Sequence, residues 1–187
     1  MKLDVVFTPA GLAPAEVQGR TAFVIDILRA TSAMCAAMSH GAKAIIPVAS
    51  TEEALRLAQT IGSGDVLLAG EKNCVRIPGF QLGNSPLEMT EAAVRGRTLI
   101  VTTTNGTKAL LACQGAAAVY PTAAVNLTAA AEKAREVLDR DGDLLVVCAG
   151  RDGSFGLDDA YCAGRLVAAA LGSRRPRRGM NDAAIGA

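Results

Sequence analysis

Short apolar runs alternate with longer amphipathic or alanine-rich stretches along most of the chain. Runs of four or five apolar residues, many of them β-branched, are typical of buried strands, and the longer stretches are typical of helices. Strands are expected at residues 3–7, 22–25, 44–48, 66–69, 98–102, 117–120 and 144–148. Such a strand-helix alternation predicts a largely parallel sheet with helices on both faces, a three-layer α/β/α fold.

Capping signals place several of the expected helices. Thr31 or Ser32 is expected to N-cap a helix that ends near His40 and Gly41, and Ser50 is expected to cap the next one through residue 59. Further helices are expected at residues 87–94, 107–113, 127–138 and 157–171. Residues 9–19 and 72–86 show no periodicity and are predicted to be loops.

The turn after the strand at residues 22–25 collects several groups with binding chemistry. Asp26 ends the strand, Arg29 follows, and Thr31 and Ser32 begin the next helix. Ligands of open α/β sheets bind beyond the carboxyl ends of the strands, so a carboxylate, a guanidinium and two hydroxyls in one turn indicate an anion or metal site. The alternative is that Asp26 and Thr31 cap the turn and that Arg29 is solvated.

Further polar groups follow other predicted strands. Glu71, Asp158 and Asp159 lie at or just beyond strand ends, where carboxylate oxygens suit a Mg²⁺ ion that bridges to phosphate. The turn at residues 102–107 either holds phosphate oxygens with its hydroxyls and amides or is an ordinary helix cap. Its candidate phosphate-binding residues are Thr103, Thr104, Asn105, Gly106 and Thr107.

Composition narrows the classes of function. The chain has 187 residues, half of them hydrophobic, with a formal net charge of +1, which gives no attraction to nucleic acid or anionic lipid. No apolar run approaches the ~20 residues of a membrane span and no signal peptide is apparent, so a cytoplasmic protein is expected. Five cysteines without a C-x-x-C pair argue against a disulfide framework and a structural zinc site, and most should be small buried hydrophobes.

Four segments carry a resemblance to a known family. They are VIDILRATS at residues 24–32, GFQLGNSP at 79–86, TTTNGT at 102–107 and CAGRDGSFGLDD at 148–159. In this order they resemble the signature segments of the 2-phosphosulfolactate phosphatases, the ComB family. The resemblance implies magnesium-dependent removal of phosphate from 2-phospho-3-sulfolactate, on the route to coenzyme M.

The implied substrate carries phosphate, carboxylate and sulfonate, so more than one cation must balance its charge. Arg29 is the first choice because its planar fork binds phosphate or sulfonate bidentately, and Arg151 is a further candidate. Asp26 is the natural central carboxylate, either holding Mg²⁺ or attacking phosphorus. Together the expected catalytic residues are Asp26, Arg29 and Glu71, and the expected metal ligands are Asp26, Glu71, Asp158 and Asp159.

The loop at residues 72–86 is long for a compact domain, and such loops are more often functional than idle. We expect residues 79–86 to close over the site and count Asn84 and Ser85 among the phosphate-binding residues. The family usually reads GFDLGNSP here, whereas this chain has Gln81 in place of the aspartate. That change weakens metal binding if the residue is a ligand and matters little if it is structural. The family's LED is Leu157-Asp158-Asp159 here, which keeps the charge with a shorter reach.

Other phosphatase mechanisms lack their residues. No cysteine is followed six positions later by arginine, and the single histidine, expected at a helix end, has no Arg-His-Gly context. Asp26 lacks the second aspartate of the D-x-D enzymes. P-loop, G-x-G-x-x-G and G-x-S-x-G motifs are also missing. The groups that remain available for phosphatase chemistry are the carboxylates and backbone donors at the strand ends.

Residues 173–187 differ from the single domain predicted for residues 1–172. The arginines within residues 174–178 have no aromatic neighbours and indicate a solvated basic tail rather than a nucleic-acid site. Asn181 and Asp182 look like the start of a helix too short to sustain itself, and the resemblance implies a truncated form. We therefore expect residues 173–187 to be poorly ordered and the uncovered apolar surface to favour a homodimer.

Taken together, the sequence predicts a Mg²⁺-dependent phosphomonoesterase acting on 2-phospho-3-sulfolactate or a similar small phosphorylated hydroxy acid. Two other classes stay open: a catalytically silent small-anion-binding module on the same fold, and a different enzyme acting on another small polyanion. Metal-dependent release of phosphate would distinguish the first class from tight anion binding without turnover.

Overall fold

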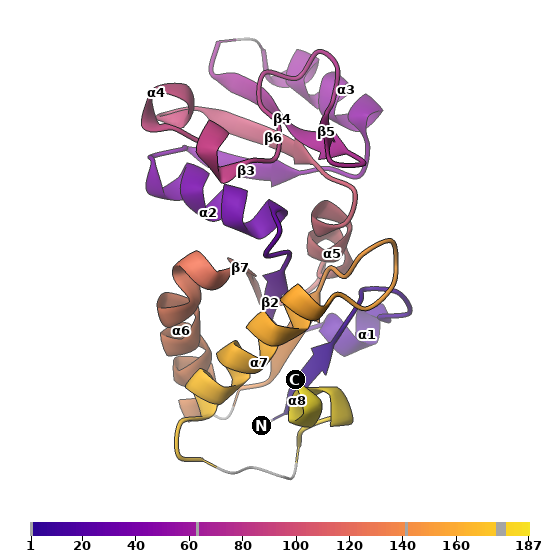
Figure 1. The fold of residues 1–187 in the computed structure, drawn as a ribbon, viewed down its shortest axis with the longest axis vertical. Coiled ribbons are helices and arrows are strands. Elements are labelled where there is room, and N and C mark those ends of the chain that lie inside the picture. The colour runs from indigo at the N-terminus through magenta and orange to yellow at the C-terminus, as the bar shows by residue number, and fades with distance from the viewer. Residues whose placement is uncertain (1, 63, 141, 175–178) are drawn as a thin grey trace.

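The strands form two four-stranded sheets (Figure 1). The computed structural model describes residues 2–62, 64–140, 142–174 and 179–187. The first sheet has the order β1-β8-β2-β7 and is parallel throughout, and the second has the order β3-β6-β4-β5, in which β5 runs antiparallel to β4. The strands are β1 (Leu3–Val6), β2 (Thr21–Ile25), β3 (Ala44–Pro47), β4 (Val66–Lys72), β5 (Val75–Arg76), β6 (Thr98–Thr102), β7 (Ala118–Thr122) and β8 (Leu144–Cys148).

Helices cover both faces of each sheet, which confirms the predicted α/β/α layering. The helices are α1 (Pro14–Val17), α2 (Ala30–Ser39), α3 (Thr51–Ile61), α4 (Glu91–Val94), α5 (Gly106–Ala112), α6 (Leu127–Asp139), α7 (Leu157–Leu171) and α8 (Asp182–Gly186), with 3₁₀ turns η1 (Pro86–Glu88) and η2 (Ala124–Asn126). The second sheet is one continuous insertion, residues 44–102, between β2 and β7. Helix α2 carries the chain out to it and α5 carries the chain back, so both lie between the sheets (Figure 1).

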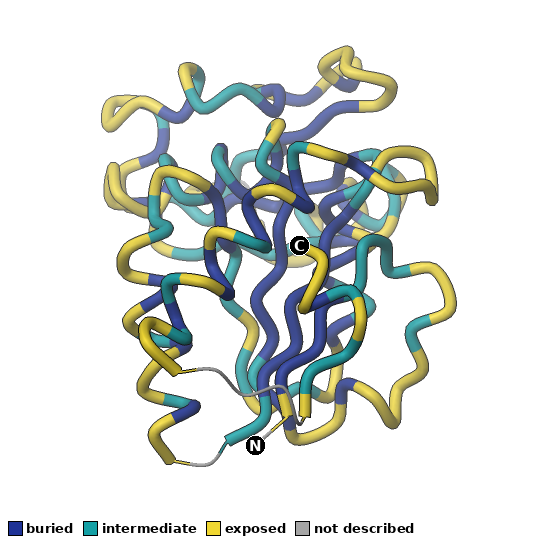
Figure 2. Tube along the Cα trace, turned by 60° about the horizontal axis from the view of Figure 1, so that its bottom comes forward, coloured by how far each residue is buried: buried dark blue, intermediate teal, exposed yellow. Residues whose placement is uncertain are grey.

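Three apolar clusters hold these layers together. The cluster on the outer face of the first sheet packs Phe23 and Val146 against α6 and α7, and the cluster on the outer face of the second sheet packs Ile100 against α3. The inner cluster joins both sheets, with Val24 and Val147 of the first and Leu99 of the second packed around α2 and α5. The buried strand segments lie side by side in the centre, and exposed residues lie on the helices and loops around them (Figure 2).

The division into two sheets differs from the one continuous sheet that the alternation suggests. The edge strands β7 and β3 face a common apolar groove of about 720 Å³, and each contains a proline, Pro121 and Pro47. Proline has no amide proton to donate to a ladder and is confined to edge strands. These two prolines therefore help to keep the sheets from pairing across the groove.

Several local predictions are confirmed at helix ends. The Ser50 hydroxyl accepts a hydrogen bond from the Glu53 amide at 3.1 Å at the start of α3. Helix α2 ends at Ser39 with His40 as its C-cap, and Gly41 follows with φ of 85°, as a C′ glycine requires. Asn126 directly precedes α6, where the helix start was expected.

Other local predictions are wrong. Arg29, not Thr31 or Ser32, is the N-cap of α2, because both hydroxyls bond back to the carbonyls of Asp26 and Ile27. The predicted loop at residues 9–19 contains α1, which begins with Pro14 at its first turn. The predicted loop at residues 72–86 begins with a tight hairpin between β4 and β5, and the predicted helix at residues 87–94 is divided into η1 and α4.

Residues 179–187 are ordered by contacts within the chain, contrary to the expectation for residues 173–187. The Asn181 side chain accepts a hydrogen bond from the Val5 amide at 3.1 Å and donates one to the Val5 carbonyl at 2.8 Å, as a strand neighbour would. Its oxygen also caps α8 by accepting from the Ala184 amide. The open edge of β1 therefore supports the short helix. The arginines at positions 175, 177 and 178 lie outside the described residues.

None of the helices within the described ranges has the length and apolar character needed to cross a membrane.

Candidate active site

A cavity of about 490 Å³ lies at the carboxyl ends of the strands, where the two sheets meet. The first sheet contributes the turn after β2 and the loop after β8. The second sheet contributes the β4–β5 hairpin, the turn after β6 and part of the loop at residues 79–86. The charged residues that line it are Asp26, Arg29, Glu71, Arg151, Asp152 and Asp158, and the uncharged ones are Leu28, Asn73, Cys74, Asn84, Thr104, Asn105 and Gly150. The cavity therefore brings together carboxylates and guanidinium groups that are far apart in the sequence.

Asp26 is a buried carboxylate that accepts backbone hydrogen bonds from Ala30 and Arg29. Its side chain is 9% exposed, and one oxygen, Oδ1, accepts a hydrogen bond from the Ala30 amide at 3.2 Å. Burial raises the pKa of Asp26, and the negative charges of Glu71 and Asp158 raise it further, whereas the Ala30 bond lowers it. A cation bound near this carboxylate would offset both the cost of burying its charge and the repulsion from Glu71 and Asp158.

Gly106 allows the second oxygen of Asp26 to lie against the start of α5. A β-carbon placed on Gly106 would be 2.5 Å from Asp26 Oδ2 and 2.5 Å from the Ala30 β-carbon. No side chain larger than hydrogen fits there without displacement. Gly106 was expected to bind phosphate, but its clear role in the structure is to allow the close approach of α5 to Asp26.

Glu71 is the corresponding buried carboxylate of the second sheet, and it is well supplied with donors. Its Oε1 accepts from the Thr104 amide at 2.7 Å, and its Oε2 accepts from the Thr104 hydroxyl at 2.9 Å and the Cys74 amide at 2.6 Å. Glu71 therefore fixes the β4–β5 hairpin to the turn after β6 while it lines the cavity.

Asp158 and Asp159 occupy different places although they are neighbours in α7. Asp158 lines the cavity, whereas Asp159 is 4% exposed and lies behind it. Asp159 accepts hydrogen bonds from the Ile27 amide at 2.9 Å and the Gly150 amide at 3.0 Å. Burial, with help from the negative charges of Asp26 and Asp158, raises the pKa of Asp159 to about 6 despite these two amide bonds.

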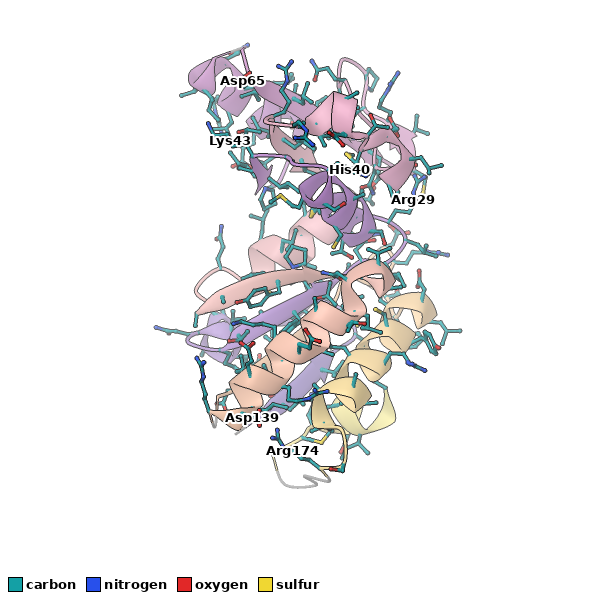
Figure 3. All side chains as sticks on the ribbon, turned by 90° about the vertical axis from the view of Figure 1, so that its left-hand side faces the viewer. Arg29, His40, Lys43, Asp65, Asp139 and Arg174 are labelled. Atoms are coloured by element: carbon teal, nitrogen blue, oxygen red, sulfur yellow. The ribbon has the colours of Figure 1, made fainter. Side chains whose placement is uncertain are left out.

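Arg29 and Arg151 supply the positive charge. Arg29 is half-buried and lies at the junction of the two parts of the molecule, whereas His40 and Lys43 lie away from it in the part that contains the second sheet (Figure 3). Within the described ranges, neither arginine forms an ion pair with an acidic side chain. Both guanidinium groups therefore remain available to an anion. Lys72 and Arg76, the basic residues of the β4–β5 hairpin, do not line the cavity.

Besides Gly106, five of the predicted phosphate-binding residues do not line the cavity; they are Thr31, Ser32, Ser85, Thr103 and Thr107. Their hydroxyls stabilise the turns instead. Thr103 and Thr107 exchange amide-to-hydroxyl bonds of 3.1 Å, and Ser85 caps η1. Asn84, Thr104, Asn105 and Arg151 do line the cavity, and the Asn105 side chain also accepts a bond from the Asp152 amide at 3.2 Å.

Asn73, Cys74 and Asp152 also line the cavity but were not among the predicted site residues. All three have positive φ, between 51° and 66°, in tight turns that follow β4 and β8. Asparagine and aspartate tolerate this conformation. An asparagine or aspartate shortly after a predicted strand was therefore the sequence signal that could have identified Asn73 and Asp152 as cavity residues. Cys74 is exposed, whereas Cys113, Cys148 and Cys162 are buried as expected, and all five cysteines are free.

Gln81, which replaces the family's aspartate, lies outside the cavity lining. Its side-chain oxygen accepts a hydrogen bond from the Leu68 amide of β4 at 2.9 Å. Position 81 therefore has a structural role in this chain, because the amide oxygen of Gln81 holds the loop against β4. The substitution leaves the carboxylates around the cavity unchanged.

The oxygen donors fit a magnesium ion, although they do not form a closed cage. Among the described residues, no group of three or more acidic, histidine or cysteine side chains has the spacing of a metal-binding cluster. Mg²⁺ is commonly held by one or two carboxylates, with waters and substrate phosphate completing its shell. Asp26 is available for this purpose, together with Glu71 and Asp158, whose negative charges raise the pKa of Asp26.

Comparison with known proteins finds matches over most of the chain. A family model described as 2-phosphosulpholactate phosphatase matches residues 6–187. A protein of Symbiobacterium thermophilum described as "Probable 2-phosphosulfolactate phosphatase" is 43% identical over 161 residues, which cover 86% of this chain and 68% of that protein. One of Clostridium acetobutylicum with the same description is 38% identical over 184 residues, covering 98% and 76% respectively. The chain therefore belongs to the 2-phosphosulpholactate phosphatase family.

Proposed function

We propose that this protein is a Mg²⁺-dependent phosphomonoesterase that hydrolyses 2-phospho-3-sulfolactate, or a similar small phosphorylated hydroxy acid, to the free hydroxy acid and phosphate. The observation that carries the proposal is the cavity that Arg29 and Arg151, which form no ion pair with any described residue, line together with Asp26, Glu71 and Asp158. Its volume of about 490 Å³ suits a small ligand. The names of the relatives support the substrate.

Arg29 and Arg151 would bind the anionic groups of the substrate, since guanidinium forks pair bidentately with phosphate, sulfonate and carboxylate oxygens. Because the two arginines come from different loops of the first sheet, they can hold two groups of one molecule. Such binding orients the phosphoester bond toward Asp26.

Asp26, Glu71 and Asp158 would hold the metal, which supplies Lewis-acid stabilisation of the phosphoryl oxygens when bound. Hydrolysis adds water across the ester: the water oxygen bonds to phosphorus, the phosphorus–oxygen bond to the hydroxy acid breaks, and a proton passes to the leaving oxygen. The buried walls around Asp26 limit access of other water and strengthen each electrostatic contact.

The test is a phosphate-release assay with 2-phospho-3-sulfolactate and a panel of small phosphorylated hydroxy acids, with Mg²⁺ and with EDTA. We expect release that requires Mg²⁺ and falls at least tenfold in Arg29→Gln, mainly through KM. Arg56→Gln is the matched control, because Arg56 is an exposed arginine of α3 outside the cavity. Tight binding of these compounds without release of phosphate would contradict the proposal and favour an anion-binding module.

A further inference from the structure

Asp159 joins two loops that carry residues of the cavity. Its Oδ1 accepts from the amide of Ile27, which directly follows Asp26, and its Oδ2 accepts from the amide of Gly150, which directly precedes Arg151. The two loops follow neighbouring strands, since β2 pairs with β8. One carboxylate thus connects the loop with Asp26 and Arg29 to the loop with Arg151 and Asp152.

The carboxylate is well placed to fix these loops. Asp159 lies in the first turn of the fifteen-residue helix α7, whose apolar face is buried against the first sheet, so its own backbone is held in place. The side chain is 4% exposed, which shields both amide bonds from water. Hydrogen bonds to a charged acceptor are stronger than those between neutral groups.

We propose that Asp159 is a positioning residue, whose buried carboxylate holds the loops of Asp26, Arg29 and Arg151 in the arrangement that turnover requires. The catalytic part of this inference rests on the proposed phosphatase function. It replaces the role of metal ligand expected from the sequence, because both oxygens of Asp159 are engaged by amides and Asp159 does not line the cavity.

The experiment compares Asp159→Asn with Asp4→Asn. Asparagine keeps one oxygen for one amide but turns an NH₂ group toward the other, so one loop loses its bond. Asp4 is also a buried carboxylate, on β1, where it pairs with Arg20 at 2.9 Å outside the cavity lining. Comparison of the two variants separates the effect of losing a buried carboxylate from the effect of releasing the loops.

Two measurements are made on both variants. Hydrogen–deuterium exchange should rise roughly tenfold or more in residues 26–30 or 149–153 of Asp159→Asn and stay unchanged there in Asp4→Asn. The turnover number kcat should fall roughly 10- to 100-fold in Asp159→Asn only, as expected for a misplaced catalytic group, and excess Mg²⁺ should not restore it. Recovery of kcat at high Mg²⁺ would show that Asp159 is a ligand and would overturn the inference.

The exchange measurement keeps this inference separate from the proposed function. If the wild type releases no phosphate, the phosphatase proposal fails while faster exchange in the Asp159 variant still demonstrates the connection between the loops. If Asp159→Asn does not fold, the amides of Ile27 and Gly150 are measured in the wild type, where slow exchange is expected. Exchange of either amide as fast as that of exposed loop amides would overturn the inference.

Discussion

Asp26 and Glu71 are two buried carboxylates on opposite sides of one cavity, and they are supported very differently. Glu71 accepts three hydrogen bonds of 2.6 to 2.9 Å, from Thr104 and Cys74, whereas Asp26 accepts a longer bond of 3.2 Å from the Ala30 amide and a weaker backbone bond from Arg29. Three short bonds stabilise the charged form of a carboxylate more than longer, weaker backbone bonds do. Under the proposed function, Glu71 would both fix the shape of the cavity and help to hold the metal, whereas the less supported Asp26 would have the larger part in the reaction.

The largest effect is expected for Asp26→Asn. Turnover should fall roughly 10²-fold or more, because the proposed metal would lose its central carboxylate. The melting temperature should stay the same or rise, because a buried carboxylate whose pKa is raised by burial costs folding free energy when charged. Asp65→Asn, at an exposed position far from the cavity, is the control. A fully active Asn variant would refute the assignment.

Gly106→Ala tests the same carboxylate without changing it. The added methyl group meets Asp26 Oδ2 and the Ala30 side chain at 2.5 Å, so Asp26 or α5 must move. We expect turnover to fall on the order of 10²-fold, and the free energy of unfolding to fall by about 1–3 kcal/mol. Gly64→Ala is the matched control, since its methyl group would meet no atom within 4 Å. Equal activity of both variants would show that the position of Asp26 is not critical.

Glu71→Gln should affect stability more clearly than Asp26→Asn does. The NH₂ group of glutamine cannot accept hydrogen bonds. At least one of the groups of Thr104 and Cys74 that donate to the carboxylate would therefore lose its acceptor. We expect the free energy of unfolding in urea to fall by about 1–3 kcal/mol, and turnover to fall about tenfold through weaker metal binding and movement of the hairpin. Glu132→Gln, on the exposed face of α6, should change neither. A stable Glu71 variant with turnover as low as that of Asp26→Asn would erase the distinction between the two carboxylates.

Asp159 gives a smaller, pH-dependent effect in metal-free protein. Its pKa in the folded state is about 6, above the value near 3.8 expected in the unfolded chain, so the unfolded state releases its proton first as pH rises. Its contribution to stability is therefore present below about pH 4 and is lost between about pH 4 and 6, on the order of 2 kcal/mol. Urea unfolding with EDTA across this range should show the decline in wild type and a flatter profile in Asp159→Asn. Identical profiles would contradict the raised pKa.

The local features of the fold were predictable because their causes are local. Ser50 with Glu53, His40 with Gly41, and the strand at residues 144–148 each depend on neighbours within a few positions. The division into two sheets was not predictable in this way, because β7 and β8, the strands that pair with β2, lie about 100 residues or more away along the chain. A short apolar strand does not specify by its own pattern which other strand it pairs with.

The same distinction applies to the cavity. Asp26, Arg29 and Glu71 could be found because ligands gather at strand ends, and they do line the cavity. Thr31 and Thr107 do not line the cavity, because a threonine hydroxyl in the first turn of a helix can bond to the backbone of its own turn instead of a ligand. Asp152 was missed because its place at the cavity depends on the turn conformation of its loop.

The alanines of the shared helical layer set the distance between the two walls of the cavity. Ala33 and Ala37 of α2 and Ala109 of α5 are at most 2% exposed in the cluster that contacts both sheets, and each presents only a methyl group there. A bulkier residue, as in Ala109→Val, would act as a spacer and move the wall of Glu71 away from the wall of Asp26. The size of substrate that the protein accepts would then depend on a residue that never contacts it, which kcat/KM for phosphoesters of increasing length would reveal.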